Sequence, residues 1–304
     1  MEPIMELENR AIGCLLGLAA GDAVGTTVEF KPRGSFQPLT DMVGGGPFGL
    51  QPGQWTDDTS MALCLGYSLD ECGGFDARDQ MARYVRWWRK GYLSSTGACF
   101  DIGVTVSGAL RKFEQSGDPL AGSTDPHTAG NGCIMRLAPI PLFYFPDIDE
   151  AEQYAAESSR TTHGAPECLD ASRLFARMLV RALLGEAKRA ILTADAATFT
   201  GAPKLEAIAR GEYLGKPPAQ IRGSGYVVDS LEAALWCFDR TDTFAGAVLL
   251  AANLGDDADT TAAVCGQIAG AYYGETGIPP AWRQRLTLAP EIAALAQQLA
   301  DARR

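Results

Sequence analysis

Glycine at every fourth position in two apolar segments limits how this chain can fold more than any other feature does. The glycines are Gly13, Gly17 and Gly21 in the segment 11–21, and Gly266, Gly270 and Gly274 in the segment 260–274. Glycine inside a helix costs roughly 1 kcal/mol relative to alanine, so a helix with this spacing needs a compensating interaction. Close contact between two backbones provides one, because glycine has no side chain to keep them apart. We therefore predict two central helices in the core, with the others packed around them.

Apolar residues elsewhere recur at intervals of three and four, which is typical of amphipathic helices. These stripes lie within 81–88, 171–183, 231–238 and 290–299. Gly185 is placed to end the second of them, and Pro290 to begin the last. Alternating patterns typical of strands are scarce. We predict an all-α fold in which residues 1–304 form one domain, with irregular Gly- and Pro-rich segments at 31–54 and 197–225.

Charge and composition exclude several classes of protein. The 26 basic and 37 acidic residues give a net charge of −11, which disfavours stable binding to the phosphate backbone of a nucleic acid. No apolar run reaches the ~20 residues that a membrane-spanning helix needs, and residues 1–10 are acidic, without the pattern of a secretion signal. Eight cysteines are scattered without a CxxC pair, which predicts reduced thiols and a cytoplasmic location.

Two acidic stretches each precede an apolar helix: WTDDTS at 55–60 and GDDADTT at 255–261. Asp and Thr accept hydrogen bonds from free N–H groups at a helix start, so either stretch alone is explained by helix capping. Together they place five carboxylates ahead of helices that we predict to be largely buried, and a buried carboxylate needs a partner. Their side-chain oxygens are the ligands that Mg²⁺, Mn²⁺ and Ca²⁺ prefer. We therefore predict that the two stretches meet and hold two such cations.

Other catalytic patterns find little support in the sequence. HExxH, GxSxG and Walker A motifs do not occur, and Pro47 interrupts a formal G-x-G-x-x-G match at 44–49 that no predicted strand precedes. His127 and His163 are the two histidines of the chain, so a Ser–His triad stays open but lacks an elbow motif.

Five segments, in order along nearly the whole chain, resemble the ADP-ribosylglycohydrolase family, above all its bacterial branch, which is typified by the dinitrogenase reductase-activating glycohydrolase. They are GLAAGDAVGTTVEF at 17–30, QWTDDTS at 54–60, GNGCIMRLAPIP at 130–141, TTHGAPECLDASR at 161–173, and the stretch from GYVVD to AYYG at 225–274. The pairing of WTDDTS with DDADTT is the specific part of this match. The resemblance implies an all-α fold of roughly orthogonal helices with a dinuclear Mg²⁺ or Mn²⁺ centre.

The resemblance also implies a set of metal ligands drawn from both acidic stretches. The matching residues are Thr56, Asp57, Asp58, Asp257, Asp259 and Thr260. Asp256 stands where many relatives have glycine, so we expect it outside this set, as a cap or a supporting group.

Two further carboxylates match catalytic positions of the family. Glu29 matches a glutamate that reaches the metal site, although a surface carboxylate beside a Gly-rich turn is the alternative interpretation. Asp101 corresponds to an acidic residue near the scissile bond, with a helix cap as the alternative. Val104 stands where relatives commonly carry Asn, so the details of that loop are not carried over.

The remaining matches concern the substrate. The resemblance implies an ADP-ribose cradle at a loop-to-helix start, where helix N-terminal amides suit a diphosphate and a plain turn is the alternative. Its residues are Asn131, Gly132, Cys133 and Met135. His163 matches a substrate contact, with a capping or core histidine as the alternative. Tyr226 resembles the aromatic residue that stacks on adenine, with packing as the alternative.

The activity implied is hydrolysis of the N-glycosidic bond between ADP-ribose and a protein side chain, most simply arginine. Cations would hold the ribose and a water molecule, and nearby carboxylates would stabilise the oxocarbenium-like transition state. The expected partners are an ADP-ribosylated protein and ADP-ribose itself. Two alternatives stay open: hydrolysis of O-linked ADP-ribose (on serine or in O-acetyl-ADP-ribose) or of an ADP-ribosylated nucleotide, and a non-catalytic regulator that binds ADP-ribose.

Overall fold

Helices form the regular structure of this protein. The computed structural model describes residues 2–193 and 198–303. The α-helices are α1 (Glu2–Gly25), α2 (Asp57–Cys72), α3 (Ala77–Lys90), α4 (Val104–Ser116), α5 (Pro139–Tyr144), α6 (Ile148–Arg160), α7 (Pro166–Leu183), α8 (Lys188–Thr193), α9 (Pro203–Ala209), α10 (Val227–Asp239), α11 (Phe244–Ala252), α12 (Ala258–Tyr273), α13 (Pro280–Arg285) and α14 (Ala289–Asp301). Short 3₁₀ helices are η1 (Thr26–Val28), η2 (Pro126–Thr128), η3 (Asn131–Cys133), η4 (Glu212–Gly215), η5 (Pro218–Gln220) and η6 (Glu275–Gly277). No strand occurs in the described ranges, which confirms the all-α prediction.

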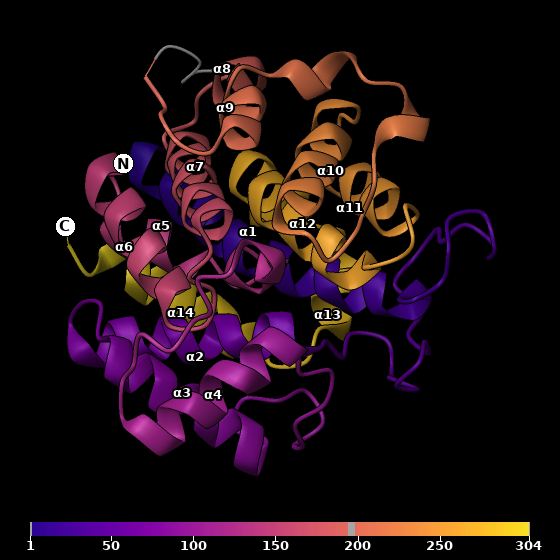
Figure 1. Ribbon diagram of the computed structural model, residues 1–304. Coiled ribbons are helices and arrows are strands. Elements are labelled where there is room, and N and C mark those ends of the chain that lie inside the picture. The colour runs from indigo at the N-terminus through magenta and orange to yellow at the C-terminus, as the bar shows by residue number, and fades with distance from the viewer. Residues whose placement is uncertain (1, 194–197, 304) are drawn as a thin grey trace.

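Helices α1 and α12 run antiparallel through the centre of the molecule (Figure 1). A Cβ atom on Gly17 would lie 2.2 Å from the carbonyl oxygen of Gly266, and one on Gly266 would lie 2.0 Å from that of Gly17. Gly13 and Gly270 face each other in the same way. Such distances leave no room for a side chain, so the predicted backbone contact is confirmed. Gly274 is different, because it follows the last residue of α12 and ends the helix with a φ of +74°.

The glycine contact continues to the N-terminal end of α12. A Cβ on Gly21 would lie 2.1 Å from the carbonyl oxygen of Ala262, and one on Gly25 would lie 2.3 Å from that of Ala258. The start of α12 is therefore held against the end of α1. Glu29 follows four residues after Gly25, so the helix contact itself brings this carboxylate beside the second acidic stretch.

The surrounding helices follow the predicted stripes. The stripes at 81–88, 171–183, 231–238 and 290–299 lie within α3, α7, α10 and α14, respectively. Gly185 follows α7 with a φ of +78°, as expected of a helix stop. The segment 31–54 contains no helix, as predicted. The prediction that 197–225 is irregular is wrong for α9, where Leu205 and Ile208 are buried in the core. Residue 197 lies outside the described residues.

The first central helix also meets a simple test for a membrane span. The segment Glu6–Val28 is long enough and has a mean hydropathy of 1.5 in its most apolar window, so the prediction that no segment reaches this length is wrong. In the fold, 89% of that window is buried inside the protein. A helix that is apolar or small on all sides is also what the centre of a helical bundle requires.

Candidate active site

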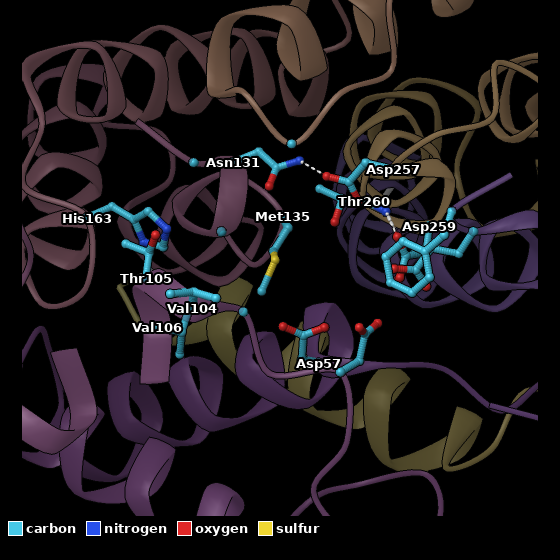
Figure 2. Close-up of a pocket in the computed structure, with 17 residues that line it drawn as sticks. Asp57, Val104, Thr105, Val106, Asn131, Met135, His163, Asp257, Asp259 and Thr260 are labelled. Carbon is cyan, nitrogen blue, oxygen red and sulfur yellow. Dashed lines mark hydrogen bonds between the residues drawn. The ribbon is translucent and has the colours of Figure 1, made fainter. Parts of the chain in front are cut away.

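A cavity of about 260 Å³ lies where the N-terminal ends of α2, α4 and α12 converge (Figure 2). Many of the residues predicted to form the site line it. They are Glu29, Asp57, Asp101, Asn131, Gly132, Met135, His163, Asp257, Asp259 and Thr260. Thr56 and Asp58 lie directly behind this wall, in contact with Asp259 and Thr260. Cys133 and Tyr226 do not line the cavity.

The two acidic stretches meet at the base of the cavity. Thr56 Oγ1 lies 3.3 Å from Asp259 Oδ2, and Thr260 Oγ1 lies 3.4 Å from Asp58 Oδ2. The predicted meeting of the two stretches is therefore confirmed. Neither of the two N-cap residues, Thr56 and Asp257, uses its side chain to cap its own helix. Capping by these residues is thus the wrong explanation of the pattern, and both helix starts point carboxylates at a common space.

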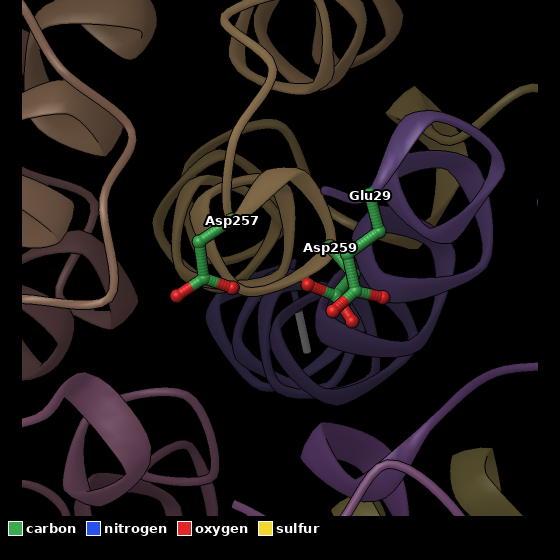
Figure 3. Close-up of side chains that lie close together, drawn as sticks. All are labelled: Glu29, Asp257 and Asp259. Atoms are coloured by element: carbon green, nitrogen blue, oxygen red, sulfur yellow. The ribbon is translucent and has the colours of Figure 1, made fainter. Parts of the chain in front are cut away.

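Glu29 joins the second stretch from the loop that follows η1. One carboxylate oxygen from each of Glu29, Asp257 and Asp259 lies within 4.8 Å of the others (Figure 3). Glu29 is 4% exposed, so the interpretation as a surface carboxylate is wrong. Burial, followed by the nearby Asp259 carboxylate, raises the pKa of Glu29 far above its ordinary value. Glu29 Oε2 and Asp58 Oδ1 are buried without a hydrogen-bond partner, and each such atom needs a ligand.

Burial and mutual repulsion raise the pKa values of the other carboxyl groups. Burial, followed by neighbouring carboxylates, raises the pKa of Asp57, Asp58 and Asp259 well above their ordinary range. The same causes, led by burial, raise the pKa of Asp101 to about 7. Within residues 2–193 and 198–303, no basic side chain forms an ion pair with these groups. A cluster of unpaired oxygen donors is the chemistry that fits hard divalent cations.

Asp22, on the central helix α1, supports the first stretch and was not singled out from the sequence. Its Oδ1 accepts hydrogen bonds from the backbone N–H and the hydroxyl of Thr56, and its Oδ2 accepts the same pair from Thr59. Burial outweighs these bonds and raises the pKa of Asp22 to about 6. A lone carboxylate in an otherwise apolar, glycine-rich segment was the signal that could have identified it.

Backbone strain collects around the cavity. Phe30, Asp101 and Asp256 adopt φ values of +62°, +60° and +59°, a region that non-glycine residues rarely occupy. Phe30 N donates to Asp256 O, which joins the Glu29 loop to the second stretch, while the Asp256 side chain is exposed outside the cavity. The alternative interpretation of Asp101 as a helix cap is wrong, because Gly103 is the N-cap residue of α4.

The loop at 130–133 differs from the predicted helix start. It forms only the single 3₁₀ turn η3, and the next α-helix along the chain begins at Pro139, so the loop does not itself start an α-helix. The amide of Asn131 is also occupied, because it donates to the carbonyl of Gly225. The Asn131 side chain instead donates to Asp257 Oδ2 at 2.8 Å. Cys133 is buried beneath the loop, where its thiol faces the carbonyl of Cys168.

His163 and Tyr226 occupy different hollows. His163 is buried and presents one edge of its ring to the cavity, and burial together with the charge of Arg136 lowers its pKa to about 3. Tyr226 lines a neighbouring hollow with Glu167 and Lys204. Its hydroxyl donates to Glu167, and Lys204 Nζ lies 4.8 Å from the ring centroid. A β-bridge pairs Gly130, which lines the cavity, with Tyr226, which lines the neighbouring hollow.

Comparison with known proteins places the chain in a family. The sequence profile described as ADP-ribosylglycohydrolase matches residues 3–304. The chain belongs to the ADP-ribosylglycohydrolase family. A solved structure from an "ADP-ribosylglycohydrolase-related protein complex" superposes with a TM-score of 0.87 at 43% identity, covering 99% of this chain and 100% of that one.

Three curated members of the ADP-ribosylglycohydrolase family show the range of similarity. The ADP-ribosylarginine hydrolase Tri1 of Pseudomonas putida is 47% identical, over 96% of this chain and 78% of that protein. Its namesake from Serratia proteamaculans is 44% identical, over 98% and 80%. The ADP-ribosyl-[dinitrogen reductase] glycohydrolase of Rhodospirillum rubrum is 32% identical, over 94% and 92%. The protein is thus a glycohydrolase enzyme, as the sequence motifs predicted.

Proposed function

We propose that this glycohydrolase cleaves the N-glycosidic bond between ADP-ribose and an arginine side chain, using two divalent cations, Mg²⁺ or Mn²⁺, held between the acidic stretches. The observation that carries the proposal is the cluster of buried carboxylates at the base of the cavity, which has no cationic partner in the described part of the chain. The names of the two Tri1 proteins, at 47% and 44% identity, support arginine as the modified residue.

The residues that would hold the cations are those whose oxygens converge behind and along the cavity wall. They are Thr56, Asp57, Asp58, Asp257, Asp259 and Thr260, with Glu29 beside them. Bound cations of this kind supply Lewis acidity and lower the pKa of coordinated water toward neutrality. Their charge would also offset the repulsion that raises the pKa values of Asp57, Asp58 and Asp259.

Asp101 and Glu29 are the proposed catalytic carboxylates. Positive charge develops at the anomeric carbon as a glycosidic bond breaks, and a carboxylate beside that carbon stabilises it. Release of the guanidine group also needs a proton. Asp101, half-buried on the cavity wall and outside the set of proposed cation ligands, suits the transfer of a proton at its carboxyl oxygen. Glu29 is more deeply buried, next to Asp259, and suits a role on the cation side.

The mouth of the cavity supports an arginine-linked substrate. Phe30 is 65% exposed and Val104 is 87% exposed, and both line the cavity near its carboxylates. Phe30 packs edge-on against Phe48, which in turn contacts Phe100, so an aromatic row extends outward from the cavity at Phe30. An arginine side chain combines an apolar stem with a cationic head, which matches an apolar rim around an acidic interior.

The decisive experiment measures release of ADP-ribose from ADP-ribosyl-arginine with Mg²⁺, with Mn²⁺ and with EDTA. We expect turnover with cations and its loss in EDTA; unchanged turnover in EDTA would refute the metal-dependent mechanism. A parallel panel of ADP-ribosyl-serine, O-acetyl-ADP-ribose and an ADP-ribosylated nucleotide tests the linkage. Faster cleavage of one of these overturns the arginine assignment, and binding of ADP-ribose without turnover of any conjugate indicates a regulator.

A further inference from the structure

Arg136 is a buried charge without a carboxylate partner among the described residues. Its side chain is 1% exposed in the core beneath the cavity, and within the described residues no Asp or Glu forms an ion pair with it. Its guanidinium lies 4.8 Å from the centroid of the Tyr84 ring, and Nη2 donates to Thr162 Oγ1 at 2.6 Å. An isolated buried charge is costly, so a residue of this kind usually performs a task that an apolar residue would not.

The contacts of Arg136 lead to the cavity through a short relay. Thr162 Oγ1 lies 2.8 Å from His163 Nδ1, and the other edge of the His163 ring faces the cavity. A guanidinium has donors only, so Thr162 Oγ1 must accept its hydrogen bond from Arg136. Within the described chain the Thr162 hydroxyl has just one other partner, His163 Nδ1, so its proton finds an acceptor there only if it is donated to that nitrogen.

This direction of hydrogen bonding decides the state of the imidazole. Nδ1 of His163 acts as an acceptor, so the ring carries its proton on Nε2. Burial and the positive charge of Arg136 both oppose a second proton, and they lower the pKa of His163 to about 3. Nε2 makes no hydrogen bond within the described residues, which leaves its N–H free for a ligand.

Gly132 allows the ring to lie where it does. A Cβ atom at this position would stand 2.7 Å from Cε1 and 3.1 Å from Nε2 of His163. Gly130 also approaches the same edge, with a hypothetical Cβ 3.4 Å from Nε2. The donor therefore opens on the loop that also carries Asn131, at the side of the cavity opposite the carboxylate cluster (Figure 2).

We propose that Arg136 is a positioning residue for the substrate: through Thr162 it holds His163 as the neutral Nε2–H tautomer, whose N–H donates to an oxygen of the ADP-ribose group. The proposal rests on the proposed function for the identity of the ligand. The tautomer itself follows from the contacts of these three side chains. A neutral donor suits this cavity, because it binds a ligand oxygen without forming an ion pair with the acidic residues.

The two-histidine composition makes the test direct. In a His127→Asn background, ¹⁵N-labelled histidine reports on His163 alone, because the chain has only these two histidines. We expect Nε2 to show a protonated-type shift and Nδ1 an unprotonated-type shift in the wild-type relay. In Thr162→Val the tautomers should mix, and the KM for ADP-ribosyl-arginine and the Kd for ADP-ribose should both rise about 5- to 10-fold with little change in kcat.

Matched variants separate positioning from stability. Thr162→Ser keeps the hydroxyl and should restore the wild-type spectrum, KM and Kd. Thr161→Val removes a neighbouring buried hydroxyl that bonds to Ser158 and Gln80 but not to His163, so its spectrum and KM should stay unchanged. Arg136→Met should give a mixture of the two His163 tautomers, as Thr162→Val does. If Arg136→Met fails to fold, the Thr162 variants still show whether the relay sets the tautomer.

The outcomes distinguish this proposal from the proposed function. A wild-type proton on Nδ1, or an unchanged tautomer and unchanged Kd in Thr162→Val, overturns the relay even if the enzyme cleaves ADP-ribosyl-arginine. Conversely, the expected tautomer and the expected loss of ADP-ribose affinity in Thr162→Val would support the relay even if no turnover of ADP-ribosyl-arginine is found.

Discussion

The starts of α2 and α12 resemble each other in sequence but are held in place differently. Both carry Asp and Thr, and both turn carboxylates toward one cavity. The first is fixed by Asp22 from the central helix, which accepts hydrogen bonds from two backbone N–H groups and two hydroxyls. The second has an amide neighbour instead, since the Asn131 side chain donates to Asp257 Oδ2.

This difference assigns the two starts to different parts of the enzyme. Asp22 is completely buried and its four hydrogen bonds belong to the core, so the first stretch is part of the stable framework. Asn131 lines the same cavity as His163, so the second stretch is tied to a loop that we propose faces the substrate. Changes at the first stretch should therefore act through stability and cation binding, and changes around Asn131 through substrate binding.

The largest effect is expected where the two stretches touch. Asp259 lies against Thr56 and also beside Glu29, so Asp259→Asn weakens cation binding by both starts at once. We expect kcat/KM to fall by about 10³-fold or more, because a metal centre contributes several kcal/mol to transition-state stabilisation. The same variant should unfold at a higher temperature than wild type in EDTA, because one buried, repelled carboxylate is gone. Retention of a tenth of the activity would contradict the proposed centre.

Asp22→Asn should break the framework of the first stretch. It replaces a carboxylate oxygen that accepts two hydrogen bonds with an NH₂ group that can only donate, so two donors of Thr56 or Thr59 lose their acceptor. We expect a loss of about 2 to 4 kcal/mol in the free energy of unfolding, measured with urea. Affinity for Mn²⁺, measured by calorimetry, should fall as well. A loss below about 1 kcal/mol would show that Asp22 is not the main support of α2.

Removing divalent cations tests whether the positive charge of bound ions stabilises the carboxylates around the starts of α2 and α12. Burial raises the folded-state pKa of Asp22 to about 6 and of Asp101 to about 7, above the ordinary value of 3.8. The folded chain then binds more protons than the unfolded chain between these limits, so its stability falls as pH rises from about 4 to about 7. In EDTA we expect a decrease of several kcal/mol across this window, and a much flatter profile in Mg²⁺. Identical profiles in the two buffers would argue against cations at the cluster.

Asn131→Ala should affect the substrate side with a smaller change in stability. The side chain donates to Asp257 Oδ2 and to Ser230 Oγ, so its removal costs about 1 kcal/mol of unfolding free energy. The KM for ADP-ribosyl-arginine should rise several-fold, because Asp257 loses the group that orients it toward the cavity. Denaturation and steady-state kinetics on the same preparation measure both quantities. A stability loss equal to that of Asp22→Asn would remove the distinction between the two starts.

The sequence predicts the parts of this molecule that depend on local spacing. Glycine at every fourth position was enough to predict that α1 and α12 are central helices with close backbone packing, because one helical period fixes which residues share a face. Each acidic stretch was visible because its residues are adjacent. That the two meet followed from the shared oxygen chemistry and from the family resemblance, since nothing in the spacing relates residue 57 to residue 259.

The features that the sequence did not yield depend on distant partners. Asp22 and Thr56 are 34 residues apart in the chain, and no local pattern indicates which groups donate hydrogen bonds to the Asp22 carboxylate. The loop at Asn131 was expected to begin a helix, but its amide bonds to Gly225, which lies far along the chain, and only a single 3₁₀ turn forms. Tyr226 stays a predicted substrate residue, and its place in a hollow next to the cavity depends on its pairing with Gly130, which is 96 residues away in the chain.

The smallest expected effect concerns the third aspartate of the second stretch. Asp256 is exposed, lies outside the cavity and has a φ of +59°, a conformation that costs glycine nothing but strains other residues. Its backbone, rather than its side chain, joins the stretch to Phe30 and Lys31. Asp256→Gly should therefore raise the free energy of unfolding by about 0.5 to 1 kcal/mol and leave kcat/KM unchanged. A loss of cation affinity in this variant would mean that the second stretch contributes all three of its carboxylates, and the division between a framework start and a substrate-linked start would have to be redrawn.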